Sequence, residues 1–383
     1  MKIPLAKPEV LEDDVAAVTA VLRSGRLSQG PVMHEFEQAL AAYLEMSQAV
    51  VVNSGTSALQ LALRALDIKE NDEVILPSFS FMAVTNAIFS EKATPVCVDI
   101  DPATLNLDPS CQEAALSRKT KAVVMVHSFG IPALAAEIVA FAKRHSLAVI
   151  EDACEALGAE IDGRKVGTFG DIATLAFYPN KVISTGEGGA LITQSAALAA
   201  RLRSLRNQGR CLGEDWLQHH EPGFSYRLSD IHCALGVQQL SRIEQTLRHR
   251  ETLARSYASQ LNINEHVTCF GAESDHGRVS WFTYPVLLSS RFSREDRDEV
   301  WAALRQKGIE TGRYFAPSHL QPALRNRDFR CGELTHTISI SERLLCLPIF
   351  NGLTEGQIRF VCSSLEEAVR SKSVPGSIHA RAS

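Results

Sequence analysis

Leu147-Ala148-Val149-Ile150-Glu151-Asp152 decides the fold, because it places two carboxylates at the end of an apolar run. The apolar residues predict a buried strand. A second apolar run, at 173–177, leads into Tyr178-Pro179-Asn180-Lys181 and a glycine-rich loop. Open α/β sheets bind ligands at the carboxyl ends of their parallel strands. The two stretches therefore predict a sheet that has a carboxylate and an amine at the carboxyl ends of its strands.

The rest of the first 240 residues extends this pattern, because apolar runs alternate with helical periodicity at short intervals. Alternating units with Val- and Ile-rich strands predict an α/β fold, with a mostly parallel central sheet sandwiched by helices. The expected strands are 49–52, 73–76, 95–100, 122–126, 147–150, 173–177 and 190–193, with helices at 32–43, 82–89 and 134–145 among them.

The length of 383 residues allows more than one domain. We expect an N-terminal arm over 1–30, a large domain over 31–240, a smaller α+β domain over 241–371 and a frayed tail over 372–383. In the second half the patterns predict a long helical stretch at 230–261, strands at 279–288 and 308–314, and a helix at 294–307.

Composition excludes several classes of protein. The formal net charge is only -5, and short basic runs such as 201–206 lack interleaved aromatics, so no nucleic-acid partner is expected. No apolar run approaches the length of a membrane span. The nine cysteines are scattered without a CxxC pair, which argues against a metal site and favours free thiols in the reducing cytoplasm.

Three features of the large domain could act together. Asn53-Ser54-Gly55-Thr56-Ser57 joins a strand to a helix, where free N–H groups either bind an anion or are simply capped. Asp152 needs a cationic partner if it is buried; a protonated pyridine nitrogen, a salt bridge or a helix cap would each serve. Lys181 could be a solvated lysine or a Schiff-base nucleophile. In combination they supply a phosphate cradle, an electron-sink partner and an aldehyde trap.

At these positions the sequence resembles the DegT/DnrJ/StrS family of nucleotide-sugar aminotransferases, which have the fold of type I pyridoxal-phosphate enzymes. The resemblance spans residues 3 to 365. Its motifs are 27–31, 54–58, 77–81, 151–152, 167–171, 177–181, 185–189 and 226–231.

The resemblance implies that pyridoxal 5'-phosphate is the cofactor and that Lys181 holds it as an internal aldimine. Asp152 would pair with the pyridine nitrogen, and Phe81 would stack on the ring. Gly55, Thr56 and Ser57 would hold the phosphate.

Three positions depart from the family's pattern. Glu155 stands where many relatives have Gln beside the ring's phenolic oxygen, and two anionic oxygens there would repel each other. Ala176 and Ser225 replace a phosphate-binding Ser and an Asn that reaches the neighbouring subunit's cofactor. The last two changes leave more of the phosphate binding to backbone donors.

The reaction implied is a ping-pong transfer of an amino group from glutamate to a nucleotide-linked keto-sugar, a 4-keto-6-deoxyhexose as in perosamine synthases. Arg227, Tyr314 and His319 would contact this substrate. His127 follows the strand at 122–126 and could either lie near the cofactor or cap the strand. A homodimer with shared active sites is also implied.

Other functions remain open at the level of sequence. A C3 keto-sugar or cyclitol aminotransferase would keep the cofactor and change the acceptor. A regulator that binds pyridoxal phosphate without turnover would carry out neither half of the amino transfer. A nicotinamide or flavin enzyme is disfavoured, because no G-x-G-x-x-G follows the first strand.

Overall fold

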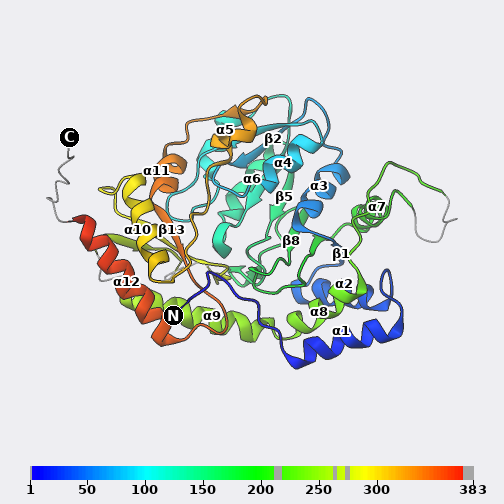
Figure 1. Cartoon of the computed structure of the whole chain (residues 1–383). Helices are drawn as coiled ribbons and strands as arrows, with labels where there is room; N and C mark the ends of the chain where they lie inside the picture. Colours follow the sequence, from blue (N-terminus) through cyan, green and yellow to red (C-terminus); the bar gives the residue numbers. More distant parts are fainter. Residues whose placement is uncertain (1, 211–217, 262–264, 272–276, 374–383) are drawn as a thin grey trace.

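A computed structural model describes residues 2–210, 218–261, 265–271 and 277–373 (Figure 1). Its centre is an eight-stranded sheet in the order β1-β9-β8-β5-β4-β2-β3-β12. Strand β9 is antiparallel to both of its neighbours, and every other pair is parallel. The strands are β1 (Gln48–Val52), β2 (Glu73–Pro77), β3 (Thr94–Val98), β4 (Thr120–Val126), β5 (Ala148–Asp152), β8 (Ile172–Ala176), β9 (Gly189–Thr193) and β12 (Arg330–Cys331). The mostly parallel sheet is confirmed.

The central strands are apolar on both faces because helices cover both sides of the sheet. In β4, Val124 packs into one core and Val123 into the opposite one, as expected from the period of two in a strand. On one side lie α3 (Gly55–Ala65), α4 (Ala83–Ser90) and α7 (Ala196–Arg206). On the other lie α2 (Pro31–Leu44), α5 (Gln112–Ala115), α6 (Ala135–Arg144) and α8 (Asp230–Ser241).

A second, smaller layer follows. It has a three-stranded antiparallel sheet in the order β10-β11-β13, namely Val267–Cys269, Tyr284–Leu288 and Leu344–Leu347. Its helices are α9 (Ile243–Leu261), α10 (Arg294–Gln306), α11 (Thr335–Arg343) and α12 (Glu355–Ser373). The remaining short elements are the hairpin Glu160–Ile161 with Arg164–Lys165 and the 3-10 turns Pro109–Cys111, Ser128–Gly130, Ser318–Leu320 and Pro322–Leu324.

Helix α9 takes part in both cores. Ile243 and Leu247 pack under the large sheet, whereas Leu253, Tyr257 and Leu261 belong to the core of the smaller layer. A division into domains near residue 240 stays a prediction, and α9 would be the element that joins the two parts.

The first residues attach to the smaller layer. Ile3 exchanges backbone hydrogen bonds with Gly308 and Glu310, just after α10, and packs in the core that also contains residues of α9 and α12. The expected arm also contains a helix, α1 (Glu12–Ser24), which packs on α8. Its N-terminus is held by Asp14, whose carboxylate accepts the Leu11 N–H.

Three sequence expectations were wrong in detail. The helical stretch at 230–261 is two helices, which break at Arg242. The strand expected at 279–288 begins only at 284. The strand expected at 308–314 is absent from the described residues; two isolated bridges, Ile3 with Ile309 and Gly312 with Cys346, take its place. Of the expected tail, 372–373 end α12 and 374–383 lie outside the described residues.

Glu37 and Arg206 form a buried ion pair that ties α2 and α7 to β1. The Glu37 Oε1 and Arg206 Nη1 atoms are 2.6 Å apart, and both side chains are about 5–6% exposed. The same two atoms bond the N–H and C=O of Val51. We expect Glu37→Ala to lower the free energy of unfolding by about 3–5 kcal/mol, because Arg206 stays buried without its carboxylate.

Urea unfolding measures this loss. The matched control is Glu355→Ala, which removes an exposed helical ion pair with Arg359 and should cost less than about 1 kcal/mol. Equal losses for the two variants would contradict the assigned role of Glu37.

Candidate active site

A cavity of about 440 Å³ opens where three neighbouring parallel strands end. Val126, Asp152 and Ala176 are the last residues of β4, β5 and β8, and all three line it. Its volume lies in the range of ligand pockets, about 300–1,000 Å³. The cavity therefore lies at the carboxyl ends of the parallel strands, where the sequence predicts a ligand site.

Asp152 is buried at one wall of this cavity, with 7% of its surface exposed. Its Oδ1 accepts hydrogen bonds from the N–H of Cys154, at 3.1 Å, and from the Thr174 hydroxyl, at 3.3 Å. The Cys154 thiol also hydrogen-bonds this carboxylate, which lines the cavity and can accept a further bond from a ligand there. A buried carboxylate in this position stabilises a cationic or proton-bearing ligand atom.

Lys181 reaches into the same cavity. Its Nζ lies 3.3 Å from Glu155 Oε1 and 4.2 Å from the centre of the Phe282 ring, and its side chain is 15% exposed. Glu155 Oε2 in turn accepts the Phe129 N–H at 2.9 Å. Burial raises the pKa of Glu155 more than the Lys181 ammonium lowers it. Lys181 is thus held between a carboxylate and an aromatic face, and it is not a solvated lysine.

The N-terminus of α3 forms another wall. Ser54 caps the helix by accepting the Ser57 N–H, which leaves the N–H groups of Gly55 and Thr56 without a partner in the described chain. A Cβ on Gly55 would lie 2.7 Å from the Ala176 Cβ, so only glycine fits there. Two free N–H groups at the positive end of a helix make an anion site.

Aromatic side chains surround the mouth. Phe81 is 64% exposed and Tyr178 52% exposed, although both line the cavity. Tyr314 and Phe315 come from the smaller layer, and Tyr314 stacks on Phe282 with ring centres 6.3 Å apart. The cavity therefore has a polar floor from the large sheet and an apolar wall from the smaller layer.

Comparison with known proteins decides the family. The sequence model of the DegT/DnrJ/EryC1/StrS aminotransferase family matches residues 8–366. The chain belongs to this family. It is an aminotransferase with the type I fold of pyridoxal-phosphate enzymes, and the family as a whole depends on that cofactor.

Three relatives illustrate the likeness. GDP-perosamine synthase of Caulobacter vibrioides is 38% identical over 348 residues, which are 89% of this chain and 91% of that protein. The aminotransferase TlmJ of Streptoalloteichus hindustanus is 30% identical, with a TM-score of 0.91 over 97% of this chain and 100% of its own. DesV of S. venezuelae, solved with a ketimine intermediate, is 36% identical, with a TM-score of 0.86 over 93% and 94%.

Most residues predicted for the family's site line the one cavity: Gly55, Thr56, Phe81, Asp152, Glu155, Lys181 and Tyr314. Three predicted residues do not line it. The Ser57 hydroxyl donates to Asn53 Oδ1, Arg227 donates to the Asn207 side chain, and His319 Nδ1 lies 2.6 Å from the Ser78 hydroxyl. Of the two further departures from the family's pattern, Ala176 lines the cavity and Ser225 is exposed.

Several cavity residues were not predicted as site residues. Asn180 precedes the lysine, and its Oδ1 is buried without a hydrogen-bond partner in the described structure. The glycine-rich loop adds Glu187 and Gly188 to the lining. Asn180 and Glu187 could have been found from their motifs, whereas Phe282 and Phe315 carry no local signal.

The cavity fits pyridoxal phosphate on its own chemistry. The free N–H groups of Gly55 and Thr56 suit the phosphate, the Asp152 carboxylate suits a protonated ring nitrogen, and Lys181 Nζ suits the aldehyde carbon. The unpartnered Asn180 Oδ1 and the exposed face of Phe81 are further groups that a ring in this cavity would cover.

Glu151, the neighbour of Asp152, is fully buried on the far side of the strand. It accepts hydrogen bonds from the N–H groups of Gly167, Phe169 and Gly170. Glycine is required at 167 by its φ of +96° and at 170 because a Cβ would lie 2.8 Å from the Val149 carbonyl oxygen. The His127 Nε2 atom lies 3.1 Å from Glu151 Oε1. The other ring nitrogen, His127 Nδ1, accepts a hydrogen bond from the Ala133 N–H. His127 therefore both lines the cavity and anchors the strand ends.

Burial alone would raise the pKa of Glu151, but the hydrogen bonds from His127, Gly167 and Gly170 outweigh it and lower the pKa. Its contribution to stability is therefore complete above the ordinary glutamate value and is lost as pH falls through the lowered pKa. We expect Glu151→Gln to cost about 2–3 kcal/mol near neutral pH. The gap between the two proteins should close in acid, as measured by urea unfolding at a series of pH values. A gap that stays constant with pH would contradict an ionised Glu151.

Proposed function

We propose that this chain transfers an amino group from glutamate to a nucleotide-linked keto-sugar, a 4-keto-6-deoxyhexose, in a ping-pong reaction with pyridoxal phosphate. The observation that carries the proposal is the single cavity shared by Lys181, Asp152 and the N-terminus of α3. Family membership alone does not assign these residues; their convergence at the strand ends supports their roles.

The bound cofactor supplies an aldehyde carbon that takes up the amino group and a ring that accepts electrons. Lys181 Nζ acts as nucleophile and then moves a proton as general base and acid. Asp152 holds the proton on the ring nitrogen through its carboxylate. Glu155, at 3.3 Å from Nζ, keeps the lysine directed into the cavity when the amine is charged.

The acceptor is inferred from two facts. GDP-perosamine synthase is similar to this chain over nearly its whole length. The apolar wall of Phe282, Tyr314 and Phe315 can pack against a deoxygenated sugar carbon, where a hydroxyl would lack a partner. A C3 keto-sugar or a cyclitol is the alternative acceptor within the same chemistry.

A homodimer with shared sites is part of the proposal. Phe81 and Tyr178 are large, exposed and at the cavity mouth, so a second subunit could cover them. We further infer a cytoplasmic location, because the cysteines of the described residues are free thiols. No helix in that part of the chain is long and apolar enough to cross a membrane. The described residues also hold no cluster suited to a metal ion.

Loss of the lysine tests the cofactor. We expect the purified protein with pyridoxal phosphate to absorb near the visible edge, and glutamate to bleach that band. Borohydride should fix the cofactor on the peptide that contains Lys181. Lys181→Ala should lose the covalent adduct and at least about 10³-fold of the activity, because it removes both nucleophile and base.

Lys165→Ala is the matched control. Lys165 has a similarly buried side chain, 20% exposed, but it pairs with Glu45 instead of lining the cavity. Full activity of Lys181→Ala, or an adduct on another lysine, would overturn the assignment.

The acceptor is tested separately. Protein first converted by glutamate is offered nucleotide-linked 4-keto-6-deoxyhexoses, 3-keto-sugars and keto-cyclitols, and the aminated product is detected by mass spectrometry. We expect the 4-keto-6-deoxyhexose to give the highest kcat/KM, by about tenfold or more over its 6-hydroxy analogue, since the apolar wall leaves that hydroxyl unpaired. Preference for a 3-keto-sugar would move the reaction to the alternative, and a cofactor band that glutamate does not bleach would favour a regulator.

A further inference from the structure

Two cysteines that are far apart in the sequence lie opposite each other on neighbouring strands. Strand β12 pairs in parallel with β3, and Cys331 is the register partner of Cys97. The Gly332 N–H bonds the Cys97 carbonyl at 3.1 Å and fixes this register. Neighbouring strands are about 4.8 Å apart, which falls within the Cα separation of about 4.4–6.8 Å that a disulfide spans.

The two thiols differ in their surroundings. Cys97 is fully buried in the core under the α3 face of the sheet, whereas Cys331 is exposed on the edge strand. The thiols hydrogen-bond each other. This bond lowers the pKa of Cys331 despite its partial burial, and together with burial it raises the pKa of Cys97. An exposed, more acidic thiol beside a buried one is the arrangement of an attacking and a resolving cysteine.

We propose that Cys331 and Cys97 are a redox-active pair that a peroxide closes into a disulfide. The Cys331 thiolate attacks one oxygen of hydrogen peroxide; the O–O bond breaks, hydroxide leaves, and Cys331 becomes a sulfenic acid. The Cys97 sulfur then attacks the Cys331 sulfur, the S–O bond breaks, and the hydroxyl leaves as water with the proton of Cys97. The two thiols lose two electrons, and the peroxide is reduced to two waters.

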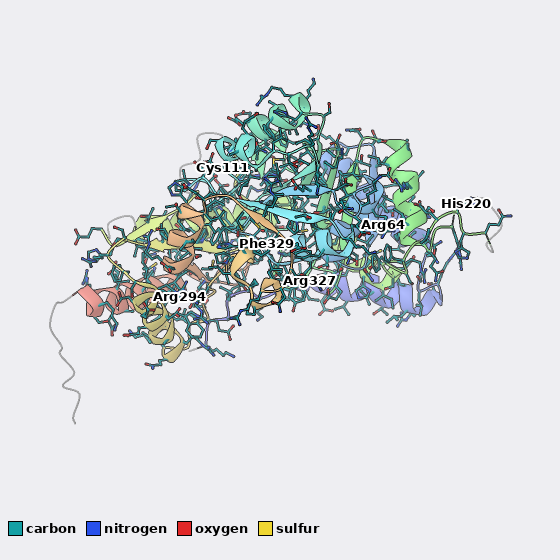
Figure 2. The ribbon with its side chains drawn as sticks, turned by 90° about the horizontal axis from the view of Figure 1, so that it is seen from above. Arg64, Cys111, His220, Arg294, Arg327 and Phe329 are labelled. Carbon is teal, nitrogen blue, oxygen red and sulfur yellow. The ribbon has the colours of Figure 1, made fainter. Side chains whose placement is uncertain are left out.

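The disulfide would fix β12, a short strand at the edge of the sheet, to its neighbour β3. Strand β12 has only two residues and forms one edge of the sheet. Figure 2 shows Arg327 and Phe329 on the ribbon that leads into it, where Arg327 lies over the Phe89 ring. Cys97 also contacts the Ser318 hydroxyl, at 3.8 Å, and Ser318 follows closely on Phe315 of the cavity wall. The pair thus links the edge strand, the sheet and the segment next to the active site.

Peptide mapping tests the pair in the intact protein. Trypsin cuts after Arg330, so Cys331 begins its own fragment, whereas Cys97 shares the fragment 93–118 with Cys111. After hydrogen peroxide we expect these two fragments to be joined, with tandem fragmentation placing the bond at Cys97, and dithiothreitol to separate them. Hydrogen exchange of 325–334 should slow at least several-fold in the oxidised protein.

Three variants separate the roles. Cys111→Ser is the control, because Cys111 packs on the opposite face of the sheet, and the joined fragments should still form. Cys331→Ser should abolish them. In Cys97→Ser we expect Cys331 to stop at a sulfenic acid that dimedone traps. The proposal is overturned if the wild type gives no joined fragments, if the bond maps to Cys111, or if dimedone labels Cys331 equally in the wild type and Cys97→Ser.

Discussion

Parallel pairing of β4, β5 and β8 is the constraint on which the site depends. Parallel strands end at the same edge, so their last residues, Val126, Asp152 and Ala176, become neighbours. The buried Glu151 network holds this edge together, because one carboxylate gathers three backbone N–H groups and an imidazole. The Asp152 carboxylate can then face the cavity, because Glu151, its neighbour in the chain, binds the backbone groups of the strand ends.

The smaller layer supplies the part of the cavity wall that the large sheet lacks. Large-sheet residues supply the charged and hydrogen-bonding groups, and the segments that contain Phe282, Tyr314 and Phe315 close the cavity with aromatic surface. Lys181 lies at the boundary, between the Glu155 carboxylate and the Phe282 ring. Both parts must be folded together for the amine to be held there.

The sequence was informative where burial and local motifs coincide. The central strands are apolar on both faces, so their type and their succession along the chain could be predicted, and Asp152 and Lys181 were found at or just after the ends of two of them. Helix α1 was missed because its apolar residues do not form one core-facing stripe: Val15 and Leu22 are exposed, whereas Val21 is buried. The strand expected at 308–314 was wrong because a short stretch with Ile309, Thr311 and Tyr314 does not reveal whether a partner strand is available; in the described residues isolated bridges form there.

Long-range packing limited the prediction of the site. Phe282 and Phe315 reach the cavity only through the fold of the smaller layer. Conversely, Arg227 and His319 bond Asn207 and Ser78, and no spacing in the sequence shows these contacts. A polar residue in a suggestive motif can thus be occupied by a neighbour that only the coordinates show.

The reversed direction of β9 has a consequence for the lysine. A parallel strand after β8 would need a crossover that returns the chain to the opposite ends of the strands. Because β9 is antiparallel, it starts at the edge where β8 stops, and the connection from Phe177 to Gly188 is closed at its base by the Phe177 N–H on the Gly188 carbonyl. The amine is therefore borne by a loop, 177–188, whose two ends are joined to each other and to neighbouring strands of the sheet.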